Sequence, residues 1–180
     1  KGSLQVEMAV TARRYGMLPY PLNPEFADLL AEIAAGNPVL VLQNLGFDWW
    51  PQWHYAVVIG YDITNNQLTL RSGTTKRCQT TFANFGLTWE RADNWALVIV
   101  PAGEMPTTAG ITTYLKTAYA FEQTGQALQA LYAYRAAANT WPGDTSSWQA
   151  LGNMAYKTGN YDEAVSALLK ASSLGPDDIV

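Results

Sequence analysis

Apolar residues recur every three or four positions in two stretches near the start of the chain, which is the spacing of an amphipathic helix. The first stretch, residues 3–15, opens on Ser3 as its predicted N-cap and stops at a glycine. The prolines of residues 17–21 then predict extended backbone, because proline is excluded from a helix interior. A second helix is predicted after residues 23–25, where Asn-Pro-Glu supplies a cap, a proline at the first helical position and a first-turn acid.

Runs of aliphatic and β-branched residues, bounded by turn residues, predict strands over residues 38–43, 54–61, 67–72 and 95–101. The Thr-Asn-Asn sequence at residues 64–66 predicts a hairpin that joins the second strand to the third, and residues 81–89 predict a short helix. Residues 1–102 are therefore predicted to form an α+β domain in which two helices precede a mostly antiparallel sheet. Residues 103–110, with Gly, Pro and Thr, are the predicted linker to the C-terminal third of the chain.

The last third of the chain repeats itself with a period of 34 residues. Matching pairs are Tyr114 and Trp148, Ala118 and Gly152, Gly125 and Gly159, Ala130 and Ala164, Tyr134 and Leu168, Ala137 and Ala171, and Pro142 and Pro176. Large, small, Gly, Ala, large, Ala and Pro in this order at this period is the tetratricopeptide pattern of two packed helices per repeat. Residues 111–180 are thus predicted to hold two repeats, at 111–144 and 145–178.

Small side chains in these repeats are predicted to let neighbouring helices approach closely, at Ala130, Ala137, Ala164 and Ala171, while Tyr134, Trp148 and Leu168 fill the seam. Tyr114 and Gly152 are further predicted packing residues of the repeats. Isolated repeats leave apolar faces uncovered. Two repeats therefore predict docking on the preceding domain, further repeats or self-association into a homo-oligomer. Repeat arrays bind proteins or peptides in their concave groove, so a protein or peptide is the predicted partner.

Composition narrows the function classes. Hydrophobic residues make up 48% of the 180 residues and charged residues 14%, which predicts a folded chain with a sizeable core. A net charge of −4 argues against nucleic acid as a partner, since phosphates are held by excess Lys and Arg.

One Cys and one His exclude a disulfide framework and the usual zinc patterns, so no metal is predicted. No nucleotide cofactor is predicted either, because no glycine-rich phosphate loop is present, and no apolar run reaches the length of a membrane span.

Candidate chemistry centres on His54, the only histidine, which opens a strand directly after an aromatic loop. The pattern His-Tyr, four apolar residues, then Gly-Tyr-Asp at residues 54–62 is preceded by an aliphatic strand and followed by a hairpin return. In this it resembles the C-terminal half of the bacteriocin-processing-like cysteine peptidases, which have a papain-like fold. The resemblance covers residues 1–101.

The resemblance implies that His54 is the imidazole of a Cys–His pair. It also implies that the nucleophilic Cys and an oxyanion-hole Gln lie on a segment before Lys1, so that this chain alone is expected to be inactive. The family's third member, an Asp or Asn that fixes the imidazole tautomer, falls on Ser72, which carries no charge to stabilise an imidazolium. Asp62 cannot replace it, because eight strand residues separate it from His54 by about 26 Å. By resemblance to envelope proteins of Gram-negative bacteria, a periplasmic location is expected.

Two hairpin registers fit the sequence around His54. In the favoured one Ser72 pairs with His54; in the other Arg77 pairs with His54 and the only thiol, Cys78, comes close, beside cations that would lower its pKa. Arg71, Lys76 and Arg77 form a small basic patch, which we interpret as a solvated face.

Trp50 and Trp53, with Trp49, either wall a peptide-binding cleft or pack the sheet edge, and packing is the favoured interpretation for most of them. Two functions are consistent with these features: part of a papain-like cysteine peptidase whose repeats bind protein, or a non-catalytic adaptor that binds a partner through its repeats.

Overall fold

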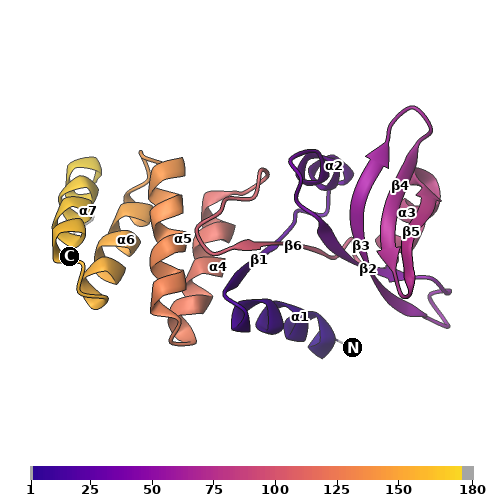
Figure 1. Ribbon diagram of the computed structural model, residues 1–180, viewed down its shortest axis with the longest axis horizontal. Helices are drawn as coiled ribbons and strands as arrows, with labels where there is room; N and C mark the ends of the chain where they lie inside the picture. The colour runs from indigo at the N-terminus through magenta and orange to yellow at the C-terminus, as the bar shows by residue number, and fades with distance from the viewer. Residues whose placement is uncertain (1, 176–180) are drawn as a thin grey trace. The chain divides into compact units, whose positions relative to one another are not determined.

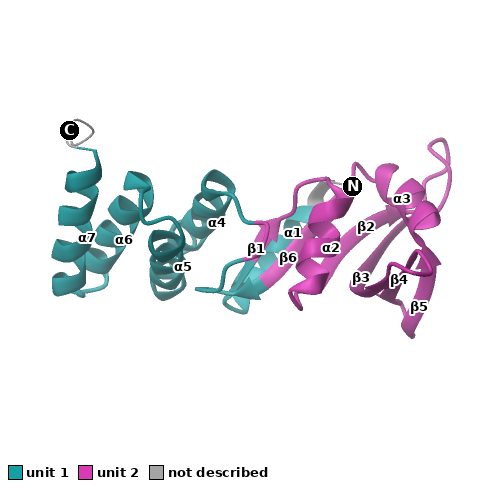
Figure 2. Ribbon diagram, turned by 90° about the horizontal axis from the view of Figure 1, so that it is seen from above, with its two compact units in different colours: residues 1–18, 100–105, 109–180 teal, residues 19–99, 106–108 magenta. Residues whose placement is uncertain are grey.

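The structure is a computed structural model that describes residues 2–175, with side chains from residue 5 onward. The predicted N-cap role of Ser3 concerns a side chain that the structure does not describe. The predicted repeat marker Pro176 lies outside the described residues. The chain divides into two compact units, shown in different colours in Figure 2. One comprises residues 1–18, 100–105 and 109–180, and the other residues 19–99 and 106–108.

A six-stranded sheet dominates the N-terminal half and makes it an α+β structure (Figure 1). Its strand order is β1-β6-β2-β3-β4-β5, and β2 with β3, β2 with β6, β3 with β4 and β4 with β5 pair antiparallel. The strands are β1 (Met17–Pro21), β2 (Val39–Asn44), β3 (Trp53–Asp62), β4 (Gln67–Ser72), β5 (Thr75–Thr81) and β6 (Ala96–Pro101). The helices of this half are α1 (Gly2–Arg14), α2 (Phe26–Ala34) and α3 (Phe82–Glu90).

Three details of this half differ from the sequence prediction. The edge strand β5 was not predicted, because its Thr-Lys-Arg-Cys-Gln-Thr-Thr sequence is mostly polar and most of its residues are exposed. The second helix is capped at Glu25 and not at Asn23, whose side chain instead donates a hydrogen bond to Asp28 at 2.9 Å. Residues 17–21 are extended as predicted, and they also pair into the sheet as β1.

The β3–β4 hairpin adopts neither of the two predicted registers. Ala56, and not His54, pairs with Ser72, and Asp62 pairs with Gln67 across a four-residue turn. The Asp62 side chain accepts hydrogen bonds from the backbone and side chain of Asn65, which centres the turn between the two predicted positions. An irregularity between Val58 and Gly60 then shifts the pairing by one further residue, as a β-bulge does.

Four helices form the C-terminal part: α4 (Ile111–Gln123), α5 (Ala127–Thr140), α6 (Thr145–Lys157) and α7 (Tyr161–Leu174). Each helix of the second pair begins 34 residues after its counterpart in the first. The turns inside the two pairs repeat as well, because Gly125 and Gly159 both have positive φ, at 75° and 82°. In each turn a Thr hydroxyl donates back to the helix and accepts a hydrogen bond from the side chain two residues later, at Thr124 and Thr158.

The predicted linker is held at two points. Thr108 donates from its backbone nitrogen and its hydroxyl to one carboxylate oxygen of Glu32, at 2.6 and 2.7 Å, and Asn37 donates to the other oxygen at 2.7 Å. Glu32 is fully buried, so these neutral donors replace the water that its carboxylate would otherwise bind. In the other unit, the Tyr114 hydroxyl donates to the carbonyl of Glu104 at 3.2 Å.

Candidate functional site

His54 and Ser72 meet on one face of the sheet. His54 lies opposite Gln43 of β2, and Ala56, two residues further along β3, lies opposite Ser72 of β4. Residues two apart in a strand point to the same face, so Ser72 is a diagonal neighbour of His54. The distance from His54 Nε2 to Ser72 Oγ is 2.7 Å, which is a hydrogen bond.

This hydrogen bond fixes which ring nitrogen is available for chemistry. Both side chains are half-buried. Among the residues that the structure describes, Nδ1 of His54 has no hydrogen-bond partner, whereas Nε2 is engaged by Ser72. If Nε2 carries the proton and donates it to Ser72, Nδ1 is the basic nitrogen of the neutral ring.

A cavity of about 190 Å³ adjoins the pair. It is lined by Gln43, Leu45, His54, Leu70, Ser72, Cys78, Thr80, Asn84 and Thr88. The strand residues come from β2 to β5 and the last two from α3, which lies over this face of the sheet. The cavity is therefore partly polar and places an imidazole, a hydroxyl and a thiol in one wall.

Gln43 is a member of the site that the sequence analysis did not single out. It is 6% exposed, lies directly opposite His54, and donates from Nε2 to the Thr88 hydroxyl at 2.7 Å. Thr88 in turn donates to the backbone carbonyls of α3. The signal was present, because strand alternation places Gln43 on the same face as the buried Val39 and Val41, where a polar side chain needs a partner.

Cys78 shares the cavity wall but stands apart from His54. It pairs with Leu70, which pairs with Val58, and Val58 is four residues along β3 from His54. Four strand residues span about 13 Å, in addition to the two strand spacings between β3 and β5. The register that would have brought the thiol beside the imidazole is therefore wrong. No group of three or more His, Cys, Asp or Glu side chains that could hold a metal occurs among the described residues.

The aromatic loop does not contribute to this cavity. Trp50 and Trp53 are 66% and 40% exposed, Trp49 is 80% exposed, and none of them lines the cavity. The interpretation that most of these side chains pack against the sheet edge is wrong for Trp49 and Trp50.

The repeat residues named from the sequence lie mostly inside the helical array. Buried among them are Tyr114, Ala130, Ala137, Gly152, Ala164 and Ala171, while Trp148 is half-buried and donates from Nε1 to the carbonyl of Pro142. Gly152 permits a close helix approach, because a Cβ at this position would lie 2.6 Å from Cγ of Leu168. Small side chains therefore line the contact between α6 and α7.

The array leaves one helix face uncovered. Tyr161, Val165 and Leu169 are spaced four residues apart on α7 and are 59–66% exposed. Leu131, the counterpart of Val165 one repeat earlier, is buried. α5 packs against α6 of the following pair. No such helix covers α7 among the described residues.

Comparison with known proteins identifies part of this array. Residues 146–178 match the family model of the tetratricopeptide repeat. They coincide with the second predicted repeat, and the first pair of helices reproduces its boundaries and turns 34 residues earlier. A tetratricopeptide repeat indicates a role in protein binding.

A search of curated proteins found no match to the chain. Of the described helices, none has the length and apolar character needed to cross a bilayer.

Proposed function

We propose that this chain carries the imidazole half of a papain-like cysteine peptidase site and binds protein through its tetratricopeptide-type helices. The observation that carries the proposal is the 2.7 Å contact of His54 Nε2 with Ser72 Oγ, which leaves Nδ1 unpartnered within the described residues, on an imidazole that lines a cavity. The nucleophile would come from a part of the protein outside these 180 residues.

The chemistry assigns one role to each nitrogen. A thiol gives its proton to Nδ1, and the resulting thiolate attacks the carbonyl carbon of the substrate. The imidazolium then returns the proton to the leaving amine nitrogen, and water cleaves the thioester. Ser72 accepts from Nε2–H and holds the ring, while Gln43, tied to Thr88, closes the other side of it.

The test uses the gene product that contains these residues, assayed for hydrolysis of a fluorescently labelled casein. We expect His54→Ala to lower kcat by about 10²- to 10⁴-fold, the usual contribution of a general base. Ser72→Ala should lower kcat less, by roughly ten-fold or less, since a neutral hydroxyl orients the ring without neutralising it. Iodoacetamide should abolish the activity.

Cys78→Ser is the matched control. Cys78 lines the same cavity but lies four residues along the sheet from His54 by register, so its substitution should leave hydrolysis unchanged. Loss of activity in Cys78→Ser would assign the nucleophile to this chain and overturn the proposal. Full activity in His54→Ala would remove the peptidase assignment.

A second candidate, a non-catalytic adaptor, is favoured by the uncovered face of α7. An adaptor would bind a partner through Val165 and Leu169 and would not need His54. On a panel of immobilised peptides, the full chain should then bind equally well as His54→Ala and lose binding as Leu169→Asp. Ser166→Ala, at an exposed position of the same helix, is the control.

A further inference from the structure

Two exposed features lie at the same end of the sheet. One is the loop of residues 45–52 between β2 and β3, of which only Leu45 lines the His54 cavity, and the other is the turn at residues 73–74 between β4 and β5. β2 and β4 run in the same direction, since each pairs antiparallel with β3. Both connections therefore leave the sheet at one end.

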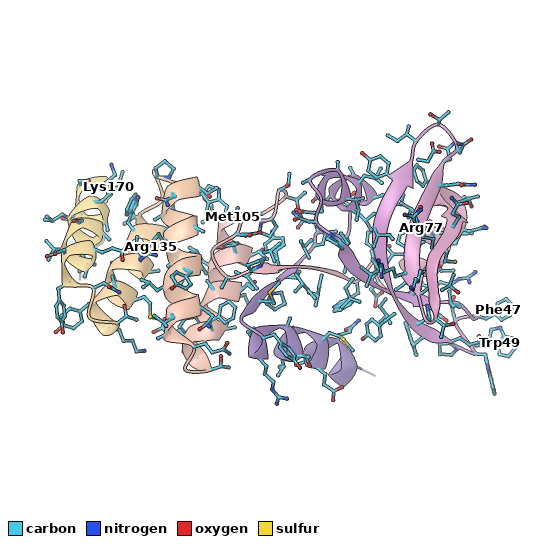
Figure 3. All side chains as sticks on the ribbon, viewed as in Figure 1. Phe47, Trp49, Arg77, Met105, Arg135 and Lys170 are labelled. Atoms are coloured by element: carbon cyan, nitrogen blue, oxygen red, sulfur yellow. The ribbon has the colours of Figure 1, made fainter. Side chains whose placement is uncertain are left out.

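The loop presents large aromatic side chains to solvent. Phe47, Trp49 and Trp50 are 60%, 80% and 66% exposed. Figure 3 shows Phe47 and Trp49 projecting beyond the ribbon, and their rings stack with centroids 5.7 Å apart and planes 8° apart. Together these rings form an apolar projection on a chain in which most large hydrophobic side chains of the sheet are buried.

This projection has a fixed shape. Oδ1 of Asn44 accepts hydrogen bonds from the backbone nitrogens of Gly46 and Gln52, at 3.0 and 2.9 Å. Arg91 donates to the carbonyl of Gly46 at 2.9 Å. Gly46 itself is required here, because a Cβ would lie 2.3 Å from the carbonyl oxygen of Trp50. The loop thus holds its aromatic rings outward without needing a ligand to order it.

The neighbouring hairpin gathers three cations. The pairing of β4 with β5 shifts between Leu70 and Ser72, so that Arg71 lies opposite both Lys76 and Arg77. All three are exposed, and none forms an ion pair with a described residue. No acidic residue occurs between residues 63 and 89. The three positive charges are therefore uncompensated by their own hairpin, on a chain whose net charge is −4.

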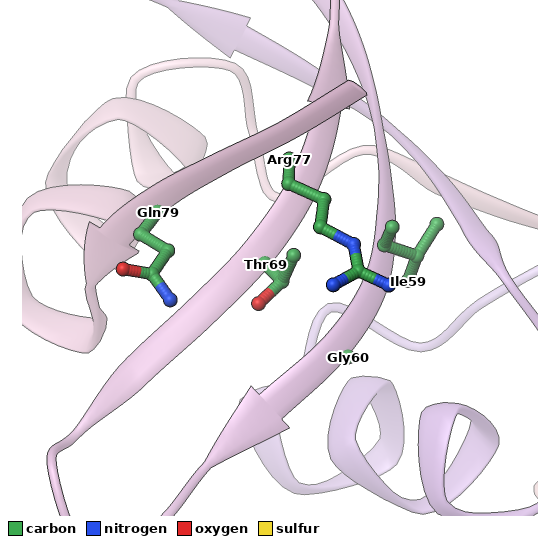
Figure 4. A pocket seen from close by; sticks show the side chains of 5 residues that line it. All are labelled: Ile59, Gly60, Thr69, Arg77 and Gln79. Atoms are coloured by element: carbon green, nitrogen blue, oxygen red, sulfur yellow. The ribbon is translucent and has the colours of Figure 1, made fainter. Parts of the chain in front are cut away.

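Arg77 lies above an open hollow on the sheet. Figure 4 shows its side chain reaching across from β5 toward Ile59, with Gly60, Thr69 and Gln79 also lining the hollow, whose volume is about 450 Å³. The absence of a side chain at Gly60 opens this space beside the guanidinium. Gly60 pairs with Thr69 close to the β3–β4 turn, so this hollow lies away from the loop of residues 45–52 and is not part of the end of the sheet described above. The Arg77 guanidinium itself, opposite Arg71, is a donor that suits the oxygen atoms of a phosphate group.

We propose that this end of the sheet binds the surface of an anionic phospholipid bilayer. Trp and Phe side chains favour the boundary between lipid headgroups and acyl chains, and Lys and Arg favour anionic headgroups. A convex, preformed aromatic tip fits a soft bilayer interface better than a small ligand, which needs a concave site. Asp48, at the tip, is the one carboxylate of the loop, and the three cations outweigh it.

Co-sedimentation of the full chain with lipid vesicles tests the proposal. We expect binding to vesicles of phosphatidylglycerol and phosphatidylcholine, and much weaker binding to phosphatidylcholine alone. Trp49→Ala with Trp50→Ala should weaken binding by about ten-fold or more, through lost apolar insertion. Arg71→Gln and Arg77→Gln should each weaken it by about five-fold, and added salt should do the same.

Matched controls separate this effect from general loss of exposed side chains. Tyr15→Ala removes an aromatic ring that is 81% exposed, and Lys116→Gln with Lys170→Gln removes two exposed charges of the repeats. These variants should bind vesicles like the unaltered chain, and circular dichroism should show all variants folded. In addition, lipids brominated near the headgroup should quench tryptophan fluorescence in the unaltered chain and much less in the double Trp variant, which keeps Trp53.

Three results would overturn the proposal. One is the absence of vesicle binding by the unaltered chain. Another is vesicle binding that survives the double Trp substitution. The third is binding of acidic peptides that depends on Arg71 and Arg77 while vesicles are ignored, which would assign the surface to a protein partner.

Discussion

Ser72 reaches His54 from beside it and not from directly across the hairpin. Its backbone pairs with Ala56, yet its hydroxyl lies 2.7 Å from Nε2 of His54. Ala56 is buried and offers only a methyl group as the directly opposed side chain. The Ser72 hydroxyl therefore finds its hydrogen-bond partner along the diagonal of the sheet, where the imidazole is.

This relationship predicts the protonation pattern of the imidazole. Because His54 is the only histidine, its ring gives a single set of nitrogen resonances. We expect the neutral ring to carry its proton on Nε2, with slow exchange against water, because the assignment of Nδ1 as the base requires Ser72 to accept from Nε2. A long-range ¹⁵N–¹H correlation spectrum checks the tautomer. In Ser72→Ala the Nε2 proton should exchange much faster.

Ser166→Ala serves as the control, because Ser166 lies on α7 and donates to the carbonyl of Asp162. Its imidazole spectrum should match that of the unaltered chain. A proton found on Nδ1 would mean that Ser72 donates to His54, and the assignment of Nδ1 as the base would fail.

The sequence indicated the neighbourhood of this pair but not its geometry. The resemblance pointed to His54 and Ser72, and the hairpin between them was predicted. The register was wrong because it depends on where the Asp62 side chain anchors the turn and on the bulge between Val58 and Gly60. Neither feature has a hydrophobic pattern of its own.

Local periodicity explains what could be predicted. The helical repeats follow from residue types that recur every 34 positions, and the structure repeats its helices and turns at that period. By contrast, β5 is a polar edge strand without alternation, and the partner of Glu32 is 76 residues away at Thr108. Such long-range polar contacts leave no short-range signal in a single sequence.

The buried Glu32 carboxylate should be a major contributor to stability. Glu32→Ala leaves the Thr108 amide and hydroxyl and the Asn37 amide without their acceptor, so we expect a loss of about 3 kcal/mol in the free energy of unfolding. Urea denaturation measures the loss, and hydrogen exchange at the Thr108 amide should accelerate. Glu25→Ala, at an exposed position without a side-chain cap bond, should change stability by less than about 0.5 kcal/mol. Equal stability of the two variants would contradict this role.

Stability of the helical array should depend on pH through Glu163. Arg135 donates two hydrogen bonds to its carboxylate, at 2.7 and 2.8 Å, and these lower the pKa of Glu163. A folded-state pKa below the unfolded one stabilises the fold above the ordinary glutamate pKa, about 4.3, and the contribution is lost as the pH falls through the lowered value. Because both side chains are partly exposed, we expect less than about 1 kcal/mol.

The measurement compares Glu163→Gln with the unaltered chain at pH 6 and at pH 3. The difference in unfolding free energy should be present at pH 6 and should shrink at pH 3, and high salt should reduce it at pH 6. A difference of the same size at both pH values would show that the Glu163 charge plays no part.

Substitution of Gly152 tests why the repeat has a glycine at this position. The structure indicates that the close approach of α6 to α7 requires it, and not backbone flexibility. A Cβ here would lie 2.6 Å from Cγ and 2.7 Å from Cδ2 of Leu168. Gly152→Ala should therefore cost about 1–3 kcal/mol through overpacking, even though alanine favours a helix by nearly 1 kcal/mol. Gly86→Ala, inside α3 with no atom within 4 Å of its Cβ, should stabilise by about 0.5–1 kcal/mol.

Combining Gly152→Ala with Leu168→Ala removes the clashing atoms and should restore part of the loss. Recovery should be incomplete, because the backbone nitrogen of Leu168 would still lie 3.3 Å from the new Cβ. Leu168→Ala alone should cost little, since Leu168 is 38% exposed. Thermal unfolding of the four chains gives the coupling energy directly. Stabilisation of the array by Gly152→Ala, of the size expected for Gly86→Ala, would contradict this prediction. It would show that the contact between α6 and α7 does not require the absence of a Cβ at residue 152.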